Sequence, residues 1–590
     1  MSMEQAKTNI LKDNIVNRIL TLIGALAMIS NLGASPKMSY DLQNTPKISA
    51  VKVIVQFNRP PGEQQHAMVK MKGGLRGDDL GLINATTYFV PSDQLESLAN
   101  HPDIKYISPD RKLSGSLEFA NPTVHANMAY KAGYTGAGIT VAVIDSGVNN
   151  SRDLASSTST RVVYNQSFIP GDARTGDAYG HGTHVAGIIA GNASLATGAF
   201  SLISFRGVAP SVNIVNLRVL DANGSGTDSS VIAAINQAIL LKNRYNIRVI
   251  NLSLGRPVFE SYLTDPLCQA AEKAWKAGIV VVVAAGNEGR NNRMGTHGYG
   301  TIMAPGNDPY VITVGAMKDM LTPTRGDDLI ASYSSKGPTL VDHVVKPDLV
   351  APGNRIVSLA AVSTIQRNSS LTTNAIPLSY YTKNISSAAS TEYYKLSGTS
   401  MAAPMVSGAA ALLLGKSSAL TPDQVKAILM KSATKTFPAV SVVYDAATFM
   451  TYTSHYDIFT VGAGYLDVWA ALNYTSIPSL GSARSPIAVP NVEKRTVSLL
   501  RGISAVWGDS AVWGDSGSFS LSAVWGASLF VQGSSAVWGD SAVWGDSAIW
   551  GDSAIWGDSA VWGDSAVWGD SAVWGDGTSK AMRILIAGEN

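Results

Sequence analysis

The sequence predicts an α/β protein with a mostly parallel central sheet and helices on both faces. Two observations predict this class: almost entirely apolar strand patterns recur between residues 139 and 317, and helical patterns separate them. Such alternation is typical of parallel sheets joined by crossover helices. A small α+β module is expected before this sheet, and the hexapeptide repeat after it is expected to be either β-solenoid-like or disordered.

Length and charge limit the classes of function. The chain has 590 residues, which is enough for several domains. Its 45 basic and 43 acidic residues are mixed without long runs of one sign, so the sequence implies neither nucleic acid nor an anionic membrane as a partner. The single cysteine, Cys268, excludes an internal disulfide, and its helical pattern favours a buried structural thiol.

The first 34 residues have the pattern of a secretory signal peptide. Basic residues precede an apolar run at 19–29, and small residues near Ala34 suit a signal-peptidase cut. A membrane anchor is the alternative, but the apolar run is shorter than the roughly 20 residues that span a bilayer. We therefore expect a secreted, extracellular protein, and its association with the cell surface stays open.

Residues 47–113 are expected to form the α+β module. Strand patterns at 49–57, 86–90 and 104–110 surround an amphipathic helix pattern at 91–102. No cluster of residues in this module looks catalytic. A globular module without a site of its own, behind a secretory signal, suggests a propeptide that assists folding or blocks a cleft.

The main domain is expected at residues 114–475 and begins with an apolar strand at 139–144. A strand that is apolar on both faces is typical of the centre of a parallel sheet. This strand delivers Asp145 at its carboxyl end, the edge at which open α/β sheets bind ligands. Further strands are expected at 212–220, 248–255, 279–287 and 310–317, and helices at 229–243 and around Cys268.

His181 begins a helical pattern directly after Gly180. The positive end of the helix dipole disfavours a protonated imidazole there, so we expect a neutral ring that is available as a base. His184 lies three residues further on, which makes a metal pair conceivable. No third ligand follows at a suitable spacing, so the sequence favours the base over a zinc site.

Asn287 and Ser400 end a strand and begin a helix, respectively. Asn287 is either a turn residue or an amide donor aimed at an oxyanion. Ser400 follows Gly398 at the start of an apolar helical run, where unpaired N–H groups and the dipole favour a developing negative charge. An ordinary helix cap is the alternative for this serine.

Four motifs resemble those of the subtilisin-like serine peptidases: VIDSG with Asp145, GHGTHVAG with His181, AAGNEG with Asn287 and SGTSMAAP with Ser400, in this order. The resemblance covers residues 119–472. It implies a subtilisin-like fold and a serine endopeptidase that acts on proteins or peptides without a cofactor. Ser400 would be the nucleophile, His181 its base, Asp145 the orienting acid, and Asn287 an oxyanion donor together with the Ser400 amide.

The same resemblance implies a substrate cleft built from three short segments. One segment would pair with an extended peptide as an edge, and the other two would form the floor. The implied substrate-binding residues are Gly224, Ser225 and Gly226 of the edge, and Ser253, Leu254, Gly255, Ala284, Ala285 and Gly286 of the floor.

The module at 47–113 resembles the inhibitor-type propeptides of the same family. This implies that the propeptide is an intramolecular inhibitor and is removed by self-cleavage between about residues 112 and 122. The family's structural calcium stays open, because residues 191–207 do not reproduce the usual short calcium loop. The metal ligands are therefore not identified, although Asp153 is one candidate. A polar insertion at 362–394 is expected to be an exposed loop, and a specificity flap is the alternative.

A linker at 476–500 leads to ten copies of SA(V/I)WG at 501–576, followed by a tail at 577–590. An even period keeps the tryptophans on one face of a strand but turns them around a helix. A β-solenoid and a low-complexity, disordered segment both fit this pattern. Exposed indoles would bind glycan, peptide or the cell envelope. The alternative function is therefore a surface or adhesion protein that keeps the peptidase domain as a scaffold.

Overall fold

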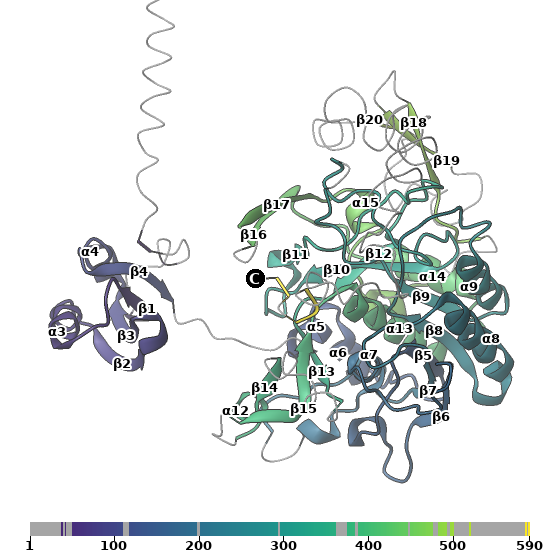
Figure 1. Ribbon diagram of the computed structural model, residues 1–590, viewed down its shortest axis with the longest axis horizontal. Helices are drawn as coiled ribbons and strands as arrows, with labels where there is room; N and C mark the ends of the chain where they lie inside the picture. The colour runs from purple at the N-terminus through teal and green to yellow at the C-terminus, as the bar shows by residue number, and fades with distance from the viewer. Residues whose placement is uncertain are drawn as a thin grey trace, which may run out of the picture. The chain divides into compact units, whose positions relative to one another are not determined.

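The computed structural model forms two compact units, Met1–Leu113 and Ser114–Asn590, which are described separately (Figure 1). The structure describes residues 37–38, 42, 50–109, 117–197, 201–292, 295–361, 374–383, 388–445, 449–475, 482–491, 496–500, 518–520, 584–586 and 588–589. The expected signal peptide lies outside the described residues, and so does the repeat apart from 518–520. Both therefore stay predictions.

Within residues 50–109, the first unit is a four-stranded antiparallel sheet with helices α3 and α4. The strand order is β2-β3-β1-β4. The elements are β1 (Ala50–Phe57), α3 (Glu63–Met71), β2 (Leu75–Leu80), β3 (Ala85–Pro91), α4 (Leu95–Ala99) and β4 (Ile104–Pro109). Alternate residues of β1 such as Val53 and Val55 are fully buried, as expected for a sheet with one face against the core. The α+β architecture expected here is present, although α3 and β2 were not predicted.

The second unit contains a mostly parallel sheet in the order β11-β10-β9-β8-β5-β7-β6, with β12 also paired to β10. Its strands are β5 (Thr140–Asp145), β6 (Val162–Ser167), β7 (Asn213–Arg218), β8 (Ile247–Leu252), β9 (Val280–Ala284), β10 (Ile312–Lys318), β11 (Leu329–Ile330) and β12 (Leu349–Pro352). Only the pair of β10 and β11 is antiparallel among these. All residues of β5, β9 and β10 are buried, which explains their apolar sequences.

Helices cover both faces of this sheet, as predicted. The pair α7 (His181–Ala190) and α13 (Thr399–Lys416) packs together, and so does the pair α8 (Asp228–Tyr245) and α9 (Pro266–Lys276). Figure 1 shows the sheet between the two pairs. Every residue of α13 from Thr399 to Leu414 is buried, so this helix runs through the core. The other described helices include α5 (Leu117–Thr123), α6 (Ala126–Lys131), α14 (Pro422–Ser432), α15 (Ile458–Val461) and α16 (Val468–Leu472).

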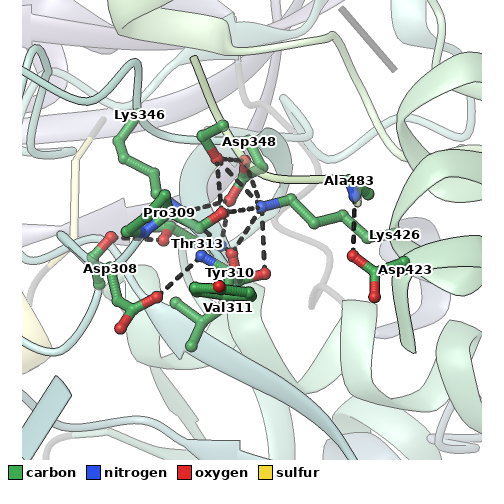
Figure 2. A network of polar contacts seen from close by, with 12 residues as sticks. Asp308, Pro309, Tyr310, Val311, Thr313, Lys346, Asp348, Asp423, Lys426 and Ala483 are labelled. Carbon is green, nitrogen blue, oxygen red and sulfur yellow. Dashed lines mark hydrogen bonds and ion pairs between the residues drawn. The ribbon is translucent and has the colours of Figure 1, made fainter. Parts of the chain in front are cut away.

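A buried ionic network joins α14 and residues 482–491 to the sheet (Figure 2). Asp348 lies directly before β12, and its carboxylate contacts Lys346 Nζ at 2.7 Å and Lys426 Nζ at 3.0 Å. All three side chains are fully buried. Ser485 donates its hydroxyl to Asp348 Oδ1 at 2.5 Å. Residues 482–491, which fall in the expected linker, therefore pack against the core of the second unit.

Small antiparallel sheets lie around the central sheet. They consist of β13 (Ile356–Leu359), β15 (Ala389–Leu396) and β14 (Ala375–Pro377) in that order, the hairpin of β16 (Val440–Asp445) and β17 (Met450–His455), and β18 (Ile487–Asn491), β19 (Thr496–Leu500) and β20 (Ser518–Ser520). The described part of the 362–394 insertion is not an exposed loop, because β14, α12 (Leu378–Tyr381) and β15 bury Tyr381 and Tyr393.

Within the described residues, no helix combines the length and the apolar character that a membrane crossing requires.

Candidate active site

Asp145 and His181 form a buried pair at the carboxyl edge of the sheet. Asp145 is the last residue of β5, and His181 is the first residue of α7. His181 Nδ1 lies 2.8 Å from Asp145 Oδ1, and the two side chains are 2% and 0% exposed. The amide of Ser146 also donates to Asp145 Oδ1, at 2.7 Å. A carboxylate in this position keeps the proton on Nδ1 and leaves Nε2 to act as a base.

The electrostatic surroundings of His181 differ from those predicted from the helix dipole. Burial lowers the pKa of His181, but the negative charge of Asp145, its hydrogen bond and the charge of Asp177 together raise the pKa above 6.5. The expected neutral imidazole therefore gains a stabilised protonated form. Such stabilisation is useful to a general base, because the base carries the proton during the reaction.

Asp177 was not predicted from the sequence, yet it holds the start of α7. Its carboxylate accepts hydrogen bonds from the amides of Gly180 at 2.6 Å and Thr183 at 2.8 Å. It also accepts the hydroxyl of Ser146 at 2.9 Å, and that hydroxyl in turn accepts the amide of Gly182. Asp177 thereby joins the end of β5 to the helix start that carries His181. The available sequence signal was an acidic residue just before a helix.

Ser400 is the second residue of α13 and lies at the same edge of the sheet. Ser253 follows β8, and its hydroxyl donates to Ser400 O at 2.8 Å, while Ser400 Oγ donates to Ser253 O at 3.3 Å. The register of the parallel pair of β5 and β8 places Val143 beside Asn251. Asp145 and Ser253 each lie two residues further along the chain. Asp145 and the Ser253 segment that contacts Ser400 therefore lie at the ends of neighbouring strands.

Asn287 lies against the turn that precedes Ser400. Thr399 donates its amide to Asn287 Oδ1 at 2.9 Å and its hydroxyl to the same oxygen at 3.1 Å. These bonds identify the oxygen of the side-chain amide and leave Nδ2 on the side of Gly398. Gly398 has φ 147°, and a Cβ there would lie 3.2 Å from Asn287 Nδ2. A glycine is therefore required where the amide donor approaches the turn.

The floor residues expected to bind substrate leave the sheet at neighbouring strand ends. Ser253, Leu254 and Gly255 follow β8, while Ala284 ends β9 and Ala285 and Gly286 continue from it. Leu252 pairs with Val283 in the parallel register of these strands. The amide of Gly286 donates to Thr399 Oγ1 at 3.1 Å, which connects this segment to the Ser400 turn.

The expected edge residues Gly224, Ser225 and Gly226 follow β7 in a turn rather than a strand. The amide of Asp221 donates to Ser225 O at 2.7 Å. A Cβ on Gly224 would lie 2.7 Å from Tyr179 Cζ. The ring of Tyr179 lies 6.3 Å from the His181 ring, so the tyrosine connects this turn to the Asp145–His181 pair. Tyr179 is a second residue that the sequence did not single out.

The residues considered for metal binding do not fit a metal. Asp153 Oδ1 accepts the amide of Leu195 at 2.8 Å and the hydroxyl of Ser194, and Oδ2 accepts the hydroxyl of Tyr393 at 2.5 Å. Protein donors therefore already use both carboxylate oxygens that a calcium ion would need. His184 Nε2 lies 3.0 Å from the carbonyl of Ile356. In the part of the chain that the structure describes, no group of three or more His, Cys, Asp or Glu side chains could hold a metal ion.

A mostly parallel sheet with an Asp–His pair and the Ser400 turn at its carboxyl edge is the arrangement expected of a subtilisin-like α/β hydrolase. The chain belongs to the subtilase family, whose model matches residues 136–447. Serine protease AprX of Bacillus subtilis (strain 168) is 35% identical over 412 residues, which are 67% of this chain and 84% of that protein. Subtilisin E of the same organism is 31% identical over 425 residues, or 70% and 93%. The chain is therefore a serine endopeptidase.

Among solved structures, the chain is similar to a cold adapted subtilisin-like serine proteinase. The sequence identity is 31%, the TM-score is 0.36, and the match covers 51% of this chain and 84% of the other.

Proposed function

We propose that this chain is a secreted serine endopeptidase that cleaves peptide bonds through an acyl-enzyme on Ser400. The observation that carries the proposal is the 2.8 Å contact between Asp145 Oδ1 and His181 Nδ1 at the carboxyl edge of the sheet. Ser400 lies at the same edge, where Ser253 forms a hydrogen bond to its backbone. Family membership favours this enzyme over the alternative of a surface protein with an inert scaffold.

In the proposed reaction, Ser400 Oγ attacks the scissile carbonyl carbon while His181 Nε2 takes the hydroxyl proton. The carbonyl oxygen becomes an oxyanion that accepts hydrogen bonds from Asn287 Nδ2 and the Ser400 amide. As the carbon–nitrogen bond breaks, His181 returns the proton to the leaving amine. Water then hydrolyses the ester with the same base. The Ser400 hydroxyl, which donates to Ser253 O in the free enzyme, must rotate toward His181 when substrate binds.

The first test is covalent labelling with a fluorophosphonate. We expect the wild type to be labelled and Ser400→Ala to remain unlabelled. Ser418→Ala, which changes an exposed serine just beyond α13, is the matched control and should be labelled like the wild type. Equal labelling of Ser400→Ala, or no labelling of a wild-type sample with a native melting transition, would contradict the proposed nucleophile.

We also propose that residues 47–113 are an inhibitory propeptide that Ser400 removes. The cut should precede α5, because Ala120 and Thr123 of this helix are fully buried in the second unit. An extended substrate bond inside a packed helix would first have to be unfolded, so we narrow the expected range of 112–122 to its part before Leu117. Mass spectrometry of purified wild type should find a new N-terminus there, whereas Ser400→Ala should keep the module.

Export through residues 1–34 and binding of glycan or cell envelope by residues 501–576 complete the proposal. Both rest on sequence patterns: a basic and then apolar N-terminal stretch, and regularly spaced tryptophans.

A further inference from the structure

The segment that follows the repeat packs into the second unit. Ile584 and Leu585 are each 5% exposed and belong to the main hydrophobic core, and Glu589 is 4% exposed. A buried carboxylate requires compensating charges and hydrogen bonds. The charges and hydrogen bonds around Glu589 therefore show whether the second unit binds this segment specifically.

Two buried cations face the Glu589 carboxylate. Arg290 Nη2 lies 2.9 Å from Oε2, and Lys318 Nζ lies 2.8 Å from Oε1. The amide and the hydroxyl of Ser332 donate to Oε2 at 2.8 and 2.5 Å. The side chains of Arg290 and Lys318 are only 8% and 3% exposed. Asp445 also pairs with Arg290, at 3.0 Å, so Glu589 supplies the second negative charge of this cluster.

Side chains and amides of the second unit also hold the backbone of the segment. Asn354 donates Nδ2 to Glu589 O at 2.8 Å, and its Oδ1 accepts the Glu589 amide at 2.8 Å. The Ser397 amide donates to Leu585 O at 2.9 Å, and Asn374 Nδ2 donates to Ile586 O at 2.7 Å. A Cβ on Gly588 would lie 2.4 Å from Ser397 Oγ, so a glycine is required at this close approach.

We infer that these residues form a binding site for the segment 584–589, which we call the tail site. Its ligand is an acidic, apolar peptide from the same chain: an Ile-Leu pair that enters the core, then a glycine, then a carboxylate between two cations. The tail site is defined by Arg290, Lys318, Ser332, Asn354, Asn374 and Ser397. The tail site attaches the chain after the repeat to the second unit, and β18 attaches the chain before the repeat.

The test uses full-length chains with Ser400→Ala, so that the probe is not digested, and it does not depend on the proposed catalysis. The probe is a fluorescent synthetic peptide with the sequence of residues 583–590. In the Glu589→Lys chain, a third cation beside Arg290 and Lys318 should expel the segment and free the tail site. We expect the probe to bind this chain at least about tenfold more tightly than the parent, whose site is occupied.

Two controls test the chemistry. A probe with glutamine in place of the glutamate, and a Glu589→Lys chain that also carries Lys318→Met, should each lose about tenfold or more in affinity. Equal binding to the parent and to Glu589→Lys, or no binding to a Glu589→Lys chain with a native melting transition, would overturn the inference. If the Glu589→Lys chain does not fold, the isosteric Glu589→Gln chain replaces it. Its affinity for the probe is then compared with that of the parent chain in the same way.

Discussion

Burial lowers the pKa of His181, and Asp145 opposes this effect mainly through its negative charge and also through its hydrogen bond. The charge of Asp145 raises the pKa of His181, and activity that needs neutral His181 is lost as the pH falls through that raised pKa. Asp145→Asn removes the charge, so the acid limb of kcat/KM should move to lower pH. We also expect kcat to fall by about 10⁴, because the asparagine favours the wrong tautomer.

The matched control is Asp177→Asn. Asp177 also raises the pKa of His181, but only through its charge and as the smallest contribution. Its replacement should move the acid limb less than Asp145→Asn does. An acid limb of kcat/KM at the same pH in Asp145→Asn as in the wild type would contradict the role of Asp145 in raising the pKa of His181.

Asn287 is expected to act in the transition state only. Asn287→Ala removes Nδ2 beside Gly398 and should cost about 2.7 to 4 kcal/mol of transition-state stabilisation, the range known for the oxyanion asparagine of subtilisin. kcat should therefore fall by about 10² to 10³ while KM changes little. Steady-state kinetics on a peptide substrate measures both. Asn473→Ala, at an exposed position, should leave both unchanged; a rise in KM alone in Asn287→Ala would point to substrate binding instead.

The sequence motifs predict Asp145, His181, Asn287 and Ser400 as the catalytic residues, but the residues that hold them in place were not predicted. Thr399 orients the Asn287 amide from 112 positions away, and Asp177 joins Ser146 to the start of α7. An acidic residue before a helix was a local signal for Asp177, but its bond to Ser146 and the bond of Thr399 to Asn287 depend on which distant segments the fold brings near. A motif predicts candidate reacting groups, whereas the residues that support them are seen only in the packed structure.

At the scale of elements, apolar runs in the sequence predicted the strands correctly, whereas segments of mixed polar and apolar residues did not. The strands β5, β7, β8, β9 and β10 lie where apolar runs predicted them. β2, with the sequence LRGDDL, was not predicted because almost all of its residues are exposed and half of them are charged. The described part of the 362–394 insertion was expected in solvent because it is rich in serine and threonine. Its tyrosines were the missed signal, since buried tyrosine hydroxyls find partners such as Asp153.

That contact predicts a stabilising role for β15. Tyr393→Phe leaves the buried Asp153 carboxylate without one of its donors, which should lower the free energy of unfolding by about 1 to 3 kcal/mol. Denaturant unfolding in the Ser400→Ala background measures the loss without self-digestion. Tyr444→Phe removes a hydroxyl from an exposed tyrosine on β16 and should change stability little. Equal stability of Tyr393→Phe and its parent would show that the hydroxyl is dispensable.

At the scale of the whole molecule, the boundary between the peptidase and the repeat is not a single point in the sequence. Truncation after residue 476 removes Ser485, which donates a hydrogen bond to the buried Asp348. It also removes Glu589, which forms ion pairs with Arg290 and Lys318. We expect it to lower the free energy of unfolding by about 3 to 5 kcal/mol, the usual cost of removing one partner from a buried ion pair. Thermal and denaturant unfolding of the Ser400→Ala chains measure this.

An internal deletion of residues 506–576 is the matched comparison, because it keeps both packed segments and, of the described elements, removes only β20. It should retain the stability and peptide hydrolysis of the full chain while losing any retention on glycan or cell envelope. Equal stability of the two shortened chains would mean that residues 482–491 and 584–589 contribute nothing to the peptidase.

Since β18 and residues 584–589 are both fixed on the second unit, the hexapeptides are inserted between two stationary points. Adding or removing whole copies changes the length of that insertion and neither of its attachments. For a flexible connection, each doubling of length costs only about 0.6 kcal/mol in closure entropy. For such a connection, the fold of the second unit would tolerate a wide range of copy numbers, because neither attachment changes.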